Sequence, residues 1–228
     1  MGRAGGDAVF QNGMSDIVCI SDLQRMFAEA AAQIRREQER LSQLDCVGGD
    51  GDHGATMVRT MEMLENEMNS ENNKPLNARL KDAGWSVLGV GGGASSALLG
   101  TFIAGMGEAD LGLESDCKHL AASFAMGLRA VEKQTKARQG DKTMMDALVP
   151  AVQAIETAAD SGEPVGRAME LAASAARTGA ESTKDMIAKY GRAKFLGEKT
   201  RGSADAGATS IALLFEGFSA ALTEHKEA

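Results

Sequence analysis

The sequence is poor both in residues that interrupt helices and in residues that favour strands. Only 3 of its 228 residues are proline, and aromatic side chains make up 4%. Proline breaks helices, whereas aromatic and β-branched residues favour strands. Good helix formers such as alanine, leucine, methionine and glutamate are abundant instead. This composition predicts an all-α protein, and a chain of this length is expected to form one domain with a sizeable core.

Cysteine and positive charge are also scarce. The three cysteines, Cys19, Cys46 and Cys117, are odd in number and widely spaced. This spacing argues against a disulfide framework and a zinc site, so we expect reduced thiols in a cytoplasmic protein. The net charge is −8, from 32 acidic and 24 basic residues. Nucleic-acid binding depends on clustered lysine and arginine, so nucleic acid is not an expected partner.

The N-terminus lacks a basic segment followed by an apolar one, so a signal peptide is not expected. Residues 1–15 are glycine-rich and are expected to form a disordered tail before a domain over residues 16–228, with Met14 as an alternative start. Residues 83–107 contain no charge and are long enough to span a membrane. They include eight glycines, three of them consecutive, which would break a spanning helix. We therefore expect two buried helices that meet at a glycine turn, and no membrane association.

Apolar residues recur at three- and four-residue steps along most of the chain. This periodicity predicts about eight helices, with Ser21 as the N-cap of the first. The expected helices cover residues 21–41, 55–68, one segment after Pro75, 95–106, 120–131, 145–159, 164–179 and 211–222. The basic, glycine-rich segment 189–207 is expected to be a long loop. The sequence therefore predicts a single-domain helical bundle.

The most informative segment is an acidic, glycine-rich loop over residues 45–54. It places Asp45, Asp50 and Asp52 within eight residues and contains four glycines. Like charges gather unfavourably unless a cation offsets them, and hard oxygen ligands favour Mg²⁺ or Ca²⁺. An EF-hand is excluded because the twelfth position counted from Asp50 is Met61 rather than glutamate. The alternative interpretation is a solvated acidic turn that caps the next helix.

Three further segments are candidates for an anion site. Residues 89–96 match G-x-G-x-x-A, but their flanks are helical. They therefore indicate either an anion site at the helix start near Ser95 or a close crossing of two helices. Residues 140–146 precede a helix and are either a helix cap or part of a site; no Walker A motif occurs in the chain. The basic segment around Arg192 is either a solvated surface or a phosphate clamp.

Two single residues add to these segments. His53 follows Asp52 directly and either contacts phosphate, orients a ligand or caps the helix. Met144 either covers an adenine face or fills the core.

Taken in order, these segments resemble the nucleotide-binding L subunits of dihydroxyacetone kinases, the DhaL family. The resemblance covers residues 21–222, and its matching pieces are Leu44-Asp45 with 49–54, 92–95, 140–143 with Asp146, 191–193, 196–198 and 207–210. It implies an antiparallel eight-helix barrel with a nucleotide held at one end.

The resemblance also implies a set of site residues. Asp45, Asp50 and Asp52 would hold two Mg²⁺ ions that bridge the phosphates of ADP or ATP. The residues implied to contact the nucleotide are His53, Gly54, Ala55, Thr56, Ala94, Ser95, Thr135, Met144, Arg192, Asp205, Ala206 and Gly207.

The activity implied is phosphoryl transfer to dihydroxyacetone held on a separate K subunit, so that this chain is active only with its partner. A phosphotransferase-system M subunit and a transcriptional regulator are further partners that the resemblance implies. Two alternatives stay open: an ATP-dependent kinase subunit for another small ketose such as a tetrulose, and a regulatory module that reports the nucleotide state. A plain Ca²⁺-binding helical protein is disfavoured by the failed EF-hand count.

Overall fold

The computed structural model describes residues 16–70, 74–88 and 93–223. The expected tail over residues 1–15, the glycine turn at 89–92 and His225 lie outside the described residues. The α-helices are α1 (Ile20–Arg36), α2 (Gln38–Asp45), α3 (His53–Met68), α4 (Leu76–Leu88), α5 (Gly93–Met106), α6 (Cys117–Gln134), α7 (Met145–Asp160), α8 (Val165–Ser182) and α9 (Ala206–Thr223). Short elements add β1 (Ile17–Cys19), β2 (Glu114–Asp116) and the 3₁₀ segments η1 (Thr183–Asp185) and η2 (Arg192–Thr200).

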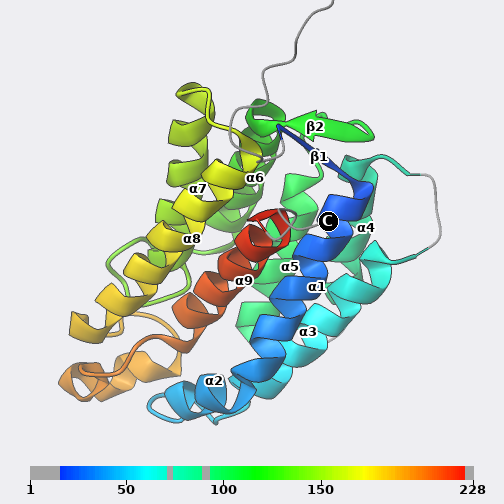
Figure 1. Ribbon diagram of the computed structural model, residues 1–228. Coiled ribbons are helices and arrows are strands. Elements are labelled where there is room, and N and C mark those ends of the chain that lie inside the picture. The colour runs from blue at the N-terminus through cyan, green and yellow to red at the C-terminus, as the bar shows by residue number, and fades with distance from the viewer. Residues whose placement is uncertain (1–15, 71–73, 89–92, 224–228) are drawn as a thin grey trace, which may run out of the picture.

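Eight of the helices in the described part of the chain form a closed ring. Helix α1 packs against α3, each helix from α3 to α8 packs against the next, and α9 returns to α1. Neighbouring helices in the ring run in opposite directions (Figure 1). The short helix α2 packs outside this sequence, against α3 and α9. The predicted all-α fold, with eight helices in an antiparallel barrel, is therefore confirmed.

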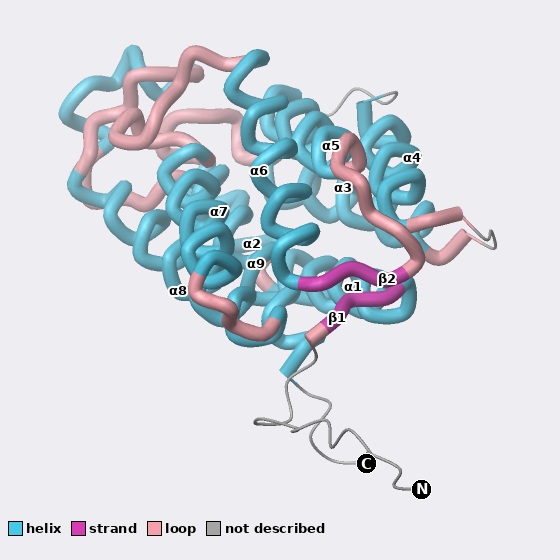
Figure 2. The backbone as a smooth tube through the Cα atoms, turned by 90° about the horizontal axis from the view of Figure 1, so that it is seen from above, coloured by secondary structure: helices cyan, strands magenta, loops and turns pink. Residues whose placement is uncertain are grey.

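Two short strands lie at one end of the barrel and were not predicted. Strand β1 pairs antiparallel with β2, with Val18 opposite Ser115. The strands lie side by side at the end opposite α2 (Figure 1, Figure 2). Each has three residues, which is too short for an alternating pattern to stand out in the sequence.

The predicted first helix differs from the structure at two points. Ser21 is not its N-cap: α1 begins at Ile20 after Cys19, whose backbone N–H donates to the Asp22 carboxylate at 2.8 Å. The helix also does not run to Leu41, because Glu37 (φ −99°, ψ 8°) leaves the helical conformation and separates α1 from α2. After this break the separate helix α2 ends at Asp45, where the acidic loop begins.

The core of the barrel is built around phenylalanine. Five phenylalanine side chains are fully buried and meet with ring centroids 5.2–6.4 Å apart: Phe27, Phe102, Phe124, Phe215 and Phe218. Among the described helices, α9 alone is long and apolar enough to cross a membrane by length and composition. Of its 18 residues, 72% are buried inside the protein. The core therefore accounts for its apolar sequence.

The segment predicted as a long loop is partly ordered. Residues 192–200 form η2, with a kink at Gly197 (φ 55°), and α9 begins at Ala206 rather than near Ile211. The short 3₁₀ turns carry no apolar periodicity, so they could not be predicted from the sequence pattern.

Candidate functional site

Four helices begin at the same end of the barrel. Because alternate helices of an up-and-down ring run in the same direction, α3, α5, α7 and α9 all start at the end opposite the strands (Figure 1). The first N–H groups of a helix have no partner within it, and its dipole is positive at this end. Four converging N-termini therefore favour an anionic ligand here.

A cavity of about 380 Å³ lies at this end. This volume falls in the range of small-molecule sites. Nine of the twelve predicted nucleotide contacts line it: His53, Ala94, Ser95, Thr135, Met144, Arg192, Asp205, Ala206 and Gly207. The other three, Gly54, Ala55 and Thr56, lie in the first turn of α3 directly after His53 and are not among the lining residues. The sequence segments are thus brought together from α3, α5, α7, η2 and α9.

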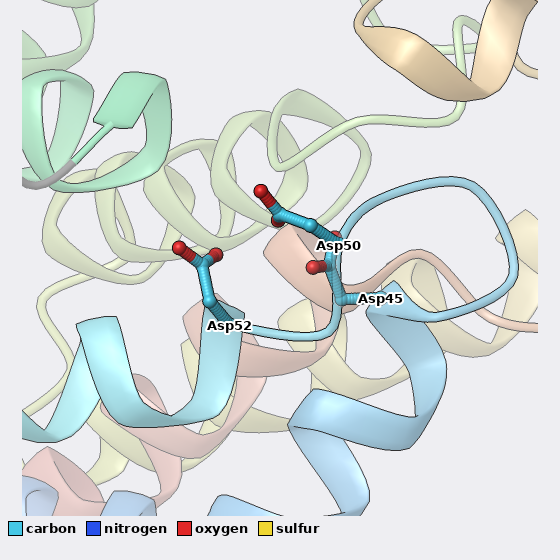
Figure 3. Close-up of side chains that lie close together, drawn as sticks. All are labelled: Asp45, Asp50 and Asp52. Carbon is cyan, nitrogen blue, oxygen red and sulfur yellow. The ribbon is translucent and has the colours of Figure 1, made fainter.

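The three predicted metal ligands are also brought together. Asp45 ends α2, Asp52 precedes α3, and Asp50 lies in the loop between them (Figure 3). One carboxylate oxygen from each lies within 4.8 Å of the others. Asp45 is partly buried and lines the cavity, whereas Asp50 and Asp52 are exposed. The cluster therefore stands at the edge of the cavity.

Glycines allow the acidic loop to fold this tightly. The backbone N–H of Gly51, in the left-handed region at φ 78°, donates to Oδ2 of Asp45 at 2.9 Å. A Cβ atom on Gly49 would lie 2.1 Å from Oδ1 of Asp45. Any side chain at Gly49 would therefore displace the Asp45 carboxylate.

One cation from η2 reaches the cluster. Arg192 forms an ion pair with Asp50, with Nη1 and Oδ2 2.7 Å apart. This guanidinium holds the pKa of the Asp50 carboxyl below its usual value. Among the described residues, this is the sole ion pair made by the three carboxylates. Three carboxylates with one arginine leave a net negative site, and the oxygen-only donor set fits Mg²⁺ or Ca²⁺.

His53 lies between the acidic loop and α9. Its side chain is 7% exposed, and its Nε2 atom lies 3.2 Å from Oγ of Ser210. Burial lowers the pKa of His53, although the nearby Asp45 carboxylate opposes this shift. The ring is therefore neutral at pH 7 and serves to bridge two helix starts rather than to add charge.

A second charged cluster, around Lys142, was missed by the sequence reasoning. Lys142 lines the cavity, is 6% exposed, and has φ 58°, a conformation that non-glycine residues rarely adopt. Its Nζ donates to the backbone carbonyls of Thr183 and Ser203 at 2.7 and 2.6 Å. Burial lowers the pKa of Lys142, although the nearby Asp205 carboxylate opposes this. Its position before α7 was the only sequence signal, and that position does not reveal burial.

Two carboxylates lie near this lysine. Asp146 is 1% exposed and accepts from the backbone N–H groups of Gly140 and Thr143 at 2.5 and 2.8 Å. Asp205 accepts from the N–H of Ala208 at 2.7 Å and thereby caps α9. Burial raises the pKa of Asp205 to about 6. These carboxylates order the starts of α7 and α9, which form one wall of the cavity.

The site combines an acidic edge with an apolar interior. Met144, Met145, Ala188 and Ala204 supply apolar surface to the cavity, while the carboxylates and Arg192 stand at the acidic loop. Such an arrangement can hold a flat apolar group in the cavity, with a charged group beside a metal ion. Fold and site together define an all-α barrel protein with a cavity at one end and a cluster of three carboxylates at the edge of that cavity.

The comparisons with known proteins agree with this class. Residues 47–220 match the family model described as the DAK2 domain. The chain is 36% identical over 181 residues to the ADP-binding subunit DhaL of the PEP-dependent dihydroxyacetone kinase of Escherichia coli, covering 79% of this chain and 86% of the relative. It is 33% identical over 191 residues to the corresponding subunit of kinase 1 from Listeria innocua, covering 84% and 91%. The chain therefore belongs to the DhaL family of DAK2-domain proteins.

Longer relatives share the domain. The L-erythrulose kinase of Pectobacterium atrosepticum is 34% identical over 192 residues, and the match spans 80% of this chain but 31% of that protein. The crystal structure of the dihydroxyacetone kinase from C. freundii, in complex with AMP-PNP and Mg²⁺, superposes with a TM-score of 0.68 at 21% identity. The match covers 96% of this chain and 37% of that one. This likeness supports the fold, and the chain corresponds to about a third of each of these longer kinases.

Proposed function

We propose that this chain is the nucleotide-binding subunit of a dihydroxyacetone kinase, a phosphotransferase that is active only with a separate K subunit. The observation that carries the proposal is the cluster of Asp45, Asp50 and Asp52 at the edge of a cavity that four helix N-termini surround. The 36% identity to a subunit of this kind, over most of both chains, supports it.

In this proposal the three aspartates hold two Mg²⁺ ions, and the cavity takes the nucleoside of ADP or ATP. Bound Mg²⁺ would neutralise charge on the phosphate oxygens that change during phosphoryl transfer. Arg192 is exposed, and within the described part of the chain its ion pair is with the exposed Asp50, so its guanidinium can turn to a phosphate with little loss of stability. The first turns of α3 and α5, which contain His53 and Ala94, would donate N–H groups to phosphate.

The remaining residues of the chain shape the site. Met144 would lie against the base, and Asp205, Ala206 and Gly207 would close the pocket. Gly207 is close to Met144, since a Cβ atom added at Gly207 would lie 3.5 Å from the Cβ of Met144. Gly54 to Thr56 would act through the first turn of α3, whose Thr56 N–H donates to the Asp52 carbonyl at 2.9 Å. Thr135 and Ser95 would complete the lining.

Native mass spectrometry with and without EDTA tests the proposal. A mass increment that corresponds to ADP plus two Mg²⁺, lost on chelation, supports a metal-bridged nucleotide held as a fixed coenzyme. Such a coenzyme would be rephosphorylated in place by an M subunit of a phosphotransferase system. Failure to bind either ADP or ATP with millimolar Mg²⁺ would contradict the proposal.

A second candidate is an ATP-dependent kinase subunit for a tetrulose. The 34% identity to an L-erythrulose kinase favours it, although that kinase is about three times longer. Nucleotide exchange separates the two candidates. If the protein is isolated without nucleotide and then binds ATP from solution, this alternative is supported. Nucleotide-dependent binding to a transcriptional regulator is compatible with both candidate functions. For either function we propose a cytoplasmic location.

A further inference from the structure

The nucleotide proposal gives no role to Lys142, which is the most deeply buried cation at the cavity among the described residues. Burying an ammonium group is costly unless its donors are satisfied. Lys142 also holds a left-handed backbone conformation, at φ 58°, that a lysine adopts only against strain. Both features need a compensating interaction, and the two carbonyl bonds of its Nζ provide one.

These two bonds connect three chain segments that are distant in sequence. Lys142 precedes α7 in the loop that carries Met144, Thr183 follows α8, and Ser203 lies in the segment that leads to Asp205. Thr183 adds a further link, because its Oγ1 accepts from the N–H of Asp205 at 2.8 Å. The lysine thus fixes the start of α7 relative to the start of α9.

The same two starts form one wall of the cavity, to which Met144 adds apolar surface. Met144 lies against Gly207, whose added Cβ would be 3.5 Å from both the Cβ and the N of Met144. The contact between the starts of α7 and α9 therefore sets the shape of this wall. A flat ring would be bound tightly only when this shape is fixed before binding.

We propose that Lys142 is a positioning residue for nucleotide recognition, which fixes the wall formed by the starts of α7 and α9 in the nucleoside part of the pocket by binding the carbonyls of Thr183 and Ser203. This inference rests on the proposed function. It concerns the nucleoside alone, because the acidic loop and Arg192 would hold the phosphates. Among the described residues, Lys142 makes no hydrogen bond or ion pair with the acidic loop or with Arg192.

The test compares Lys142→Met with Lys184→Met. Methionine keeps an unbranched side chain, one heavy atom shorter than lysine, and cannot donate to the two carbonyls. Lys184 is the matched control, since it follows Thr183 but points outward to an ion pair with Glu181. Isothermal titration calorimetry then measures the binding of ADP and of inorganic pyrophosphate, each with Mg²⁺.

We expect Lys142→Met to weaken ADP binding by about tenfold or more, as for the loss of hydrogen bonds to a charged group. Pyrophosphate binding should change by less than about twofold, since it does not use the wall. The control should leave both unchanged. Equal weakening of ADP and pyrophosphate would overturn the proposal, because it would indicate a phosphate contact or a general structural loss.

Hydrogen exchange of the free proteins separates positioning from direct contact. The amides of Thr143 and Asp205 are hydrogen-bonded at 2.8 Å to Asp146 and Thr183. Lys142→Met should speed their exchange in the absence of nucleotide, and unchanged exchange would count against positioning. If this variant does not fold, the same two titrations are made with Lys142→Gln, which retains an amide donor. A larger loss of affinity for ADP than for pyrophosphate supports the proposal, and an equal loss overturns it. If the unaltered protein binds neither ligand, the proposed function itself fails.

Discussion

The geometry of the acidic loop predicts that Gly49→Ala strongly weakens metal-dependent ADP binding, although no ligand residue is replaced. An added Cβ would lie 2.1 Å from Oδ1 of Asp45, whereas real Cβ contacts are essentially never under 3.0 Å, so the carboxylate must move by about 0.9 Å. Mg²⁺ demands ligands at about 2.0–2.1 Å in near-ideal octahedral geometry, so this displacement takes Asp45 out of the coordination sphere. We expect Mg²⁺-dependent ADP binding to weaken by about 100-fold or more, which is roughly 2.8 kcal/mol.

Titration calorimetry with ADP at fixed Mg²⁺ measures this loss. The matched control is Gly112→Ala, whose Cβ would meet its nearest neighbour, the Glu114 carbonyl, at an ordinary 3.6 Å. The control should bind ADP as the unaltered protein does. Because Asp45 is only partly buried and can swing outward, Gly49→Ala should change the free energy of unfolding by less than about 1 kcal/mol. Unaltered ADP affinity in Gly49→Ala would refute the assignment of Asp45 as a ligand.

Three further predictions follow from single contacts. Arg192→Gln should leave the melting temperature unchanged, because its ion pair is exposed, but should let the pKa of Asp50 rise toward its usual value in an NMR titration. Burial raises the pKa of Asp205 from 3.8 to about 6, so ionisation of this carboxyl destabilises the fold as the pH rises through this interval. In urea unfolding, the stability of Asp205→Asn relative to the unaltered protein should therefore increase between pH 4 and pH 7. A difference in stability that does not depend on pH would contradict this. Gly217→Ala should lose about 1–3 kcal/mol in the same assay with ADP affinity retained, since its Cβ would lie 2.4 Å from the backbone of Ala30 in α1.

Much of the fold was predictable because the helices bury continuous apolar faces. Periodicity located the ring helices, and Pro164 correctly marked the start of α8, where it is the N-cap. The start of α1 was predicted wrongly, since serine is a commoner cap than cysteine and the bond from Cys19 to Asp22 depends on backbone geometry. The break at Glu37 has no proline or glycine to announce it.

The site was predictable where residue type carries the chemistry. Asp45, Asp50 and Asp52 are close in sequence, and glycines between them allow convergence, so their meeting in space was expected. The Lys142 cluster was not predicted, because its bonds go to backbone carbonyls 41 and 61 residues away. Backbone carbonyls are present at every residue, so no sequence pattern indicates which of them a lysine will bind.

In the proposed function, the aspartate cluster holds metal ions that bridge a nucleotide. A crystal structure with Mn²⁺ and ADP tests it directly, because manganese gives an anomalous signal at its own position. We predict anomalous peaks between the carboxylates of Asp45, Asp50 and Asp52 and the phosphates of ADP, with the base in the cavity beside Met144. ADP bound elsewhere, or bound in this cavity with no manganese peak at the three aspartates, would contradict the account.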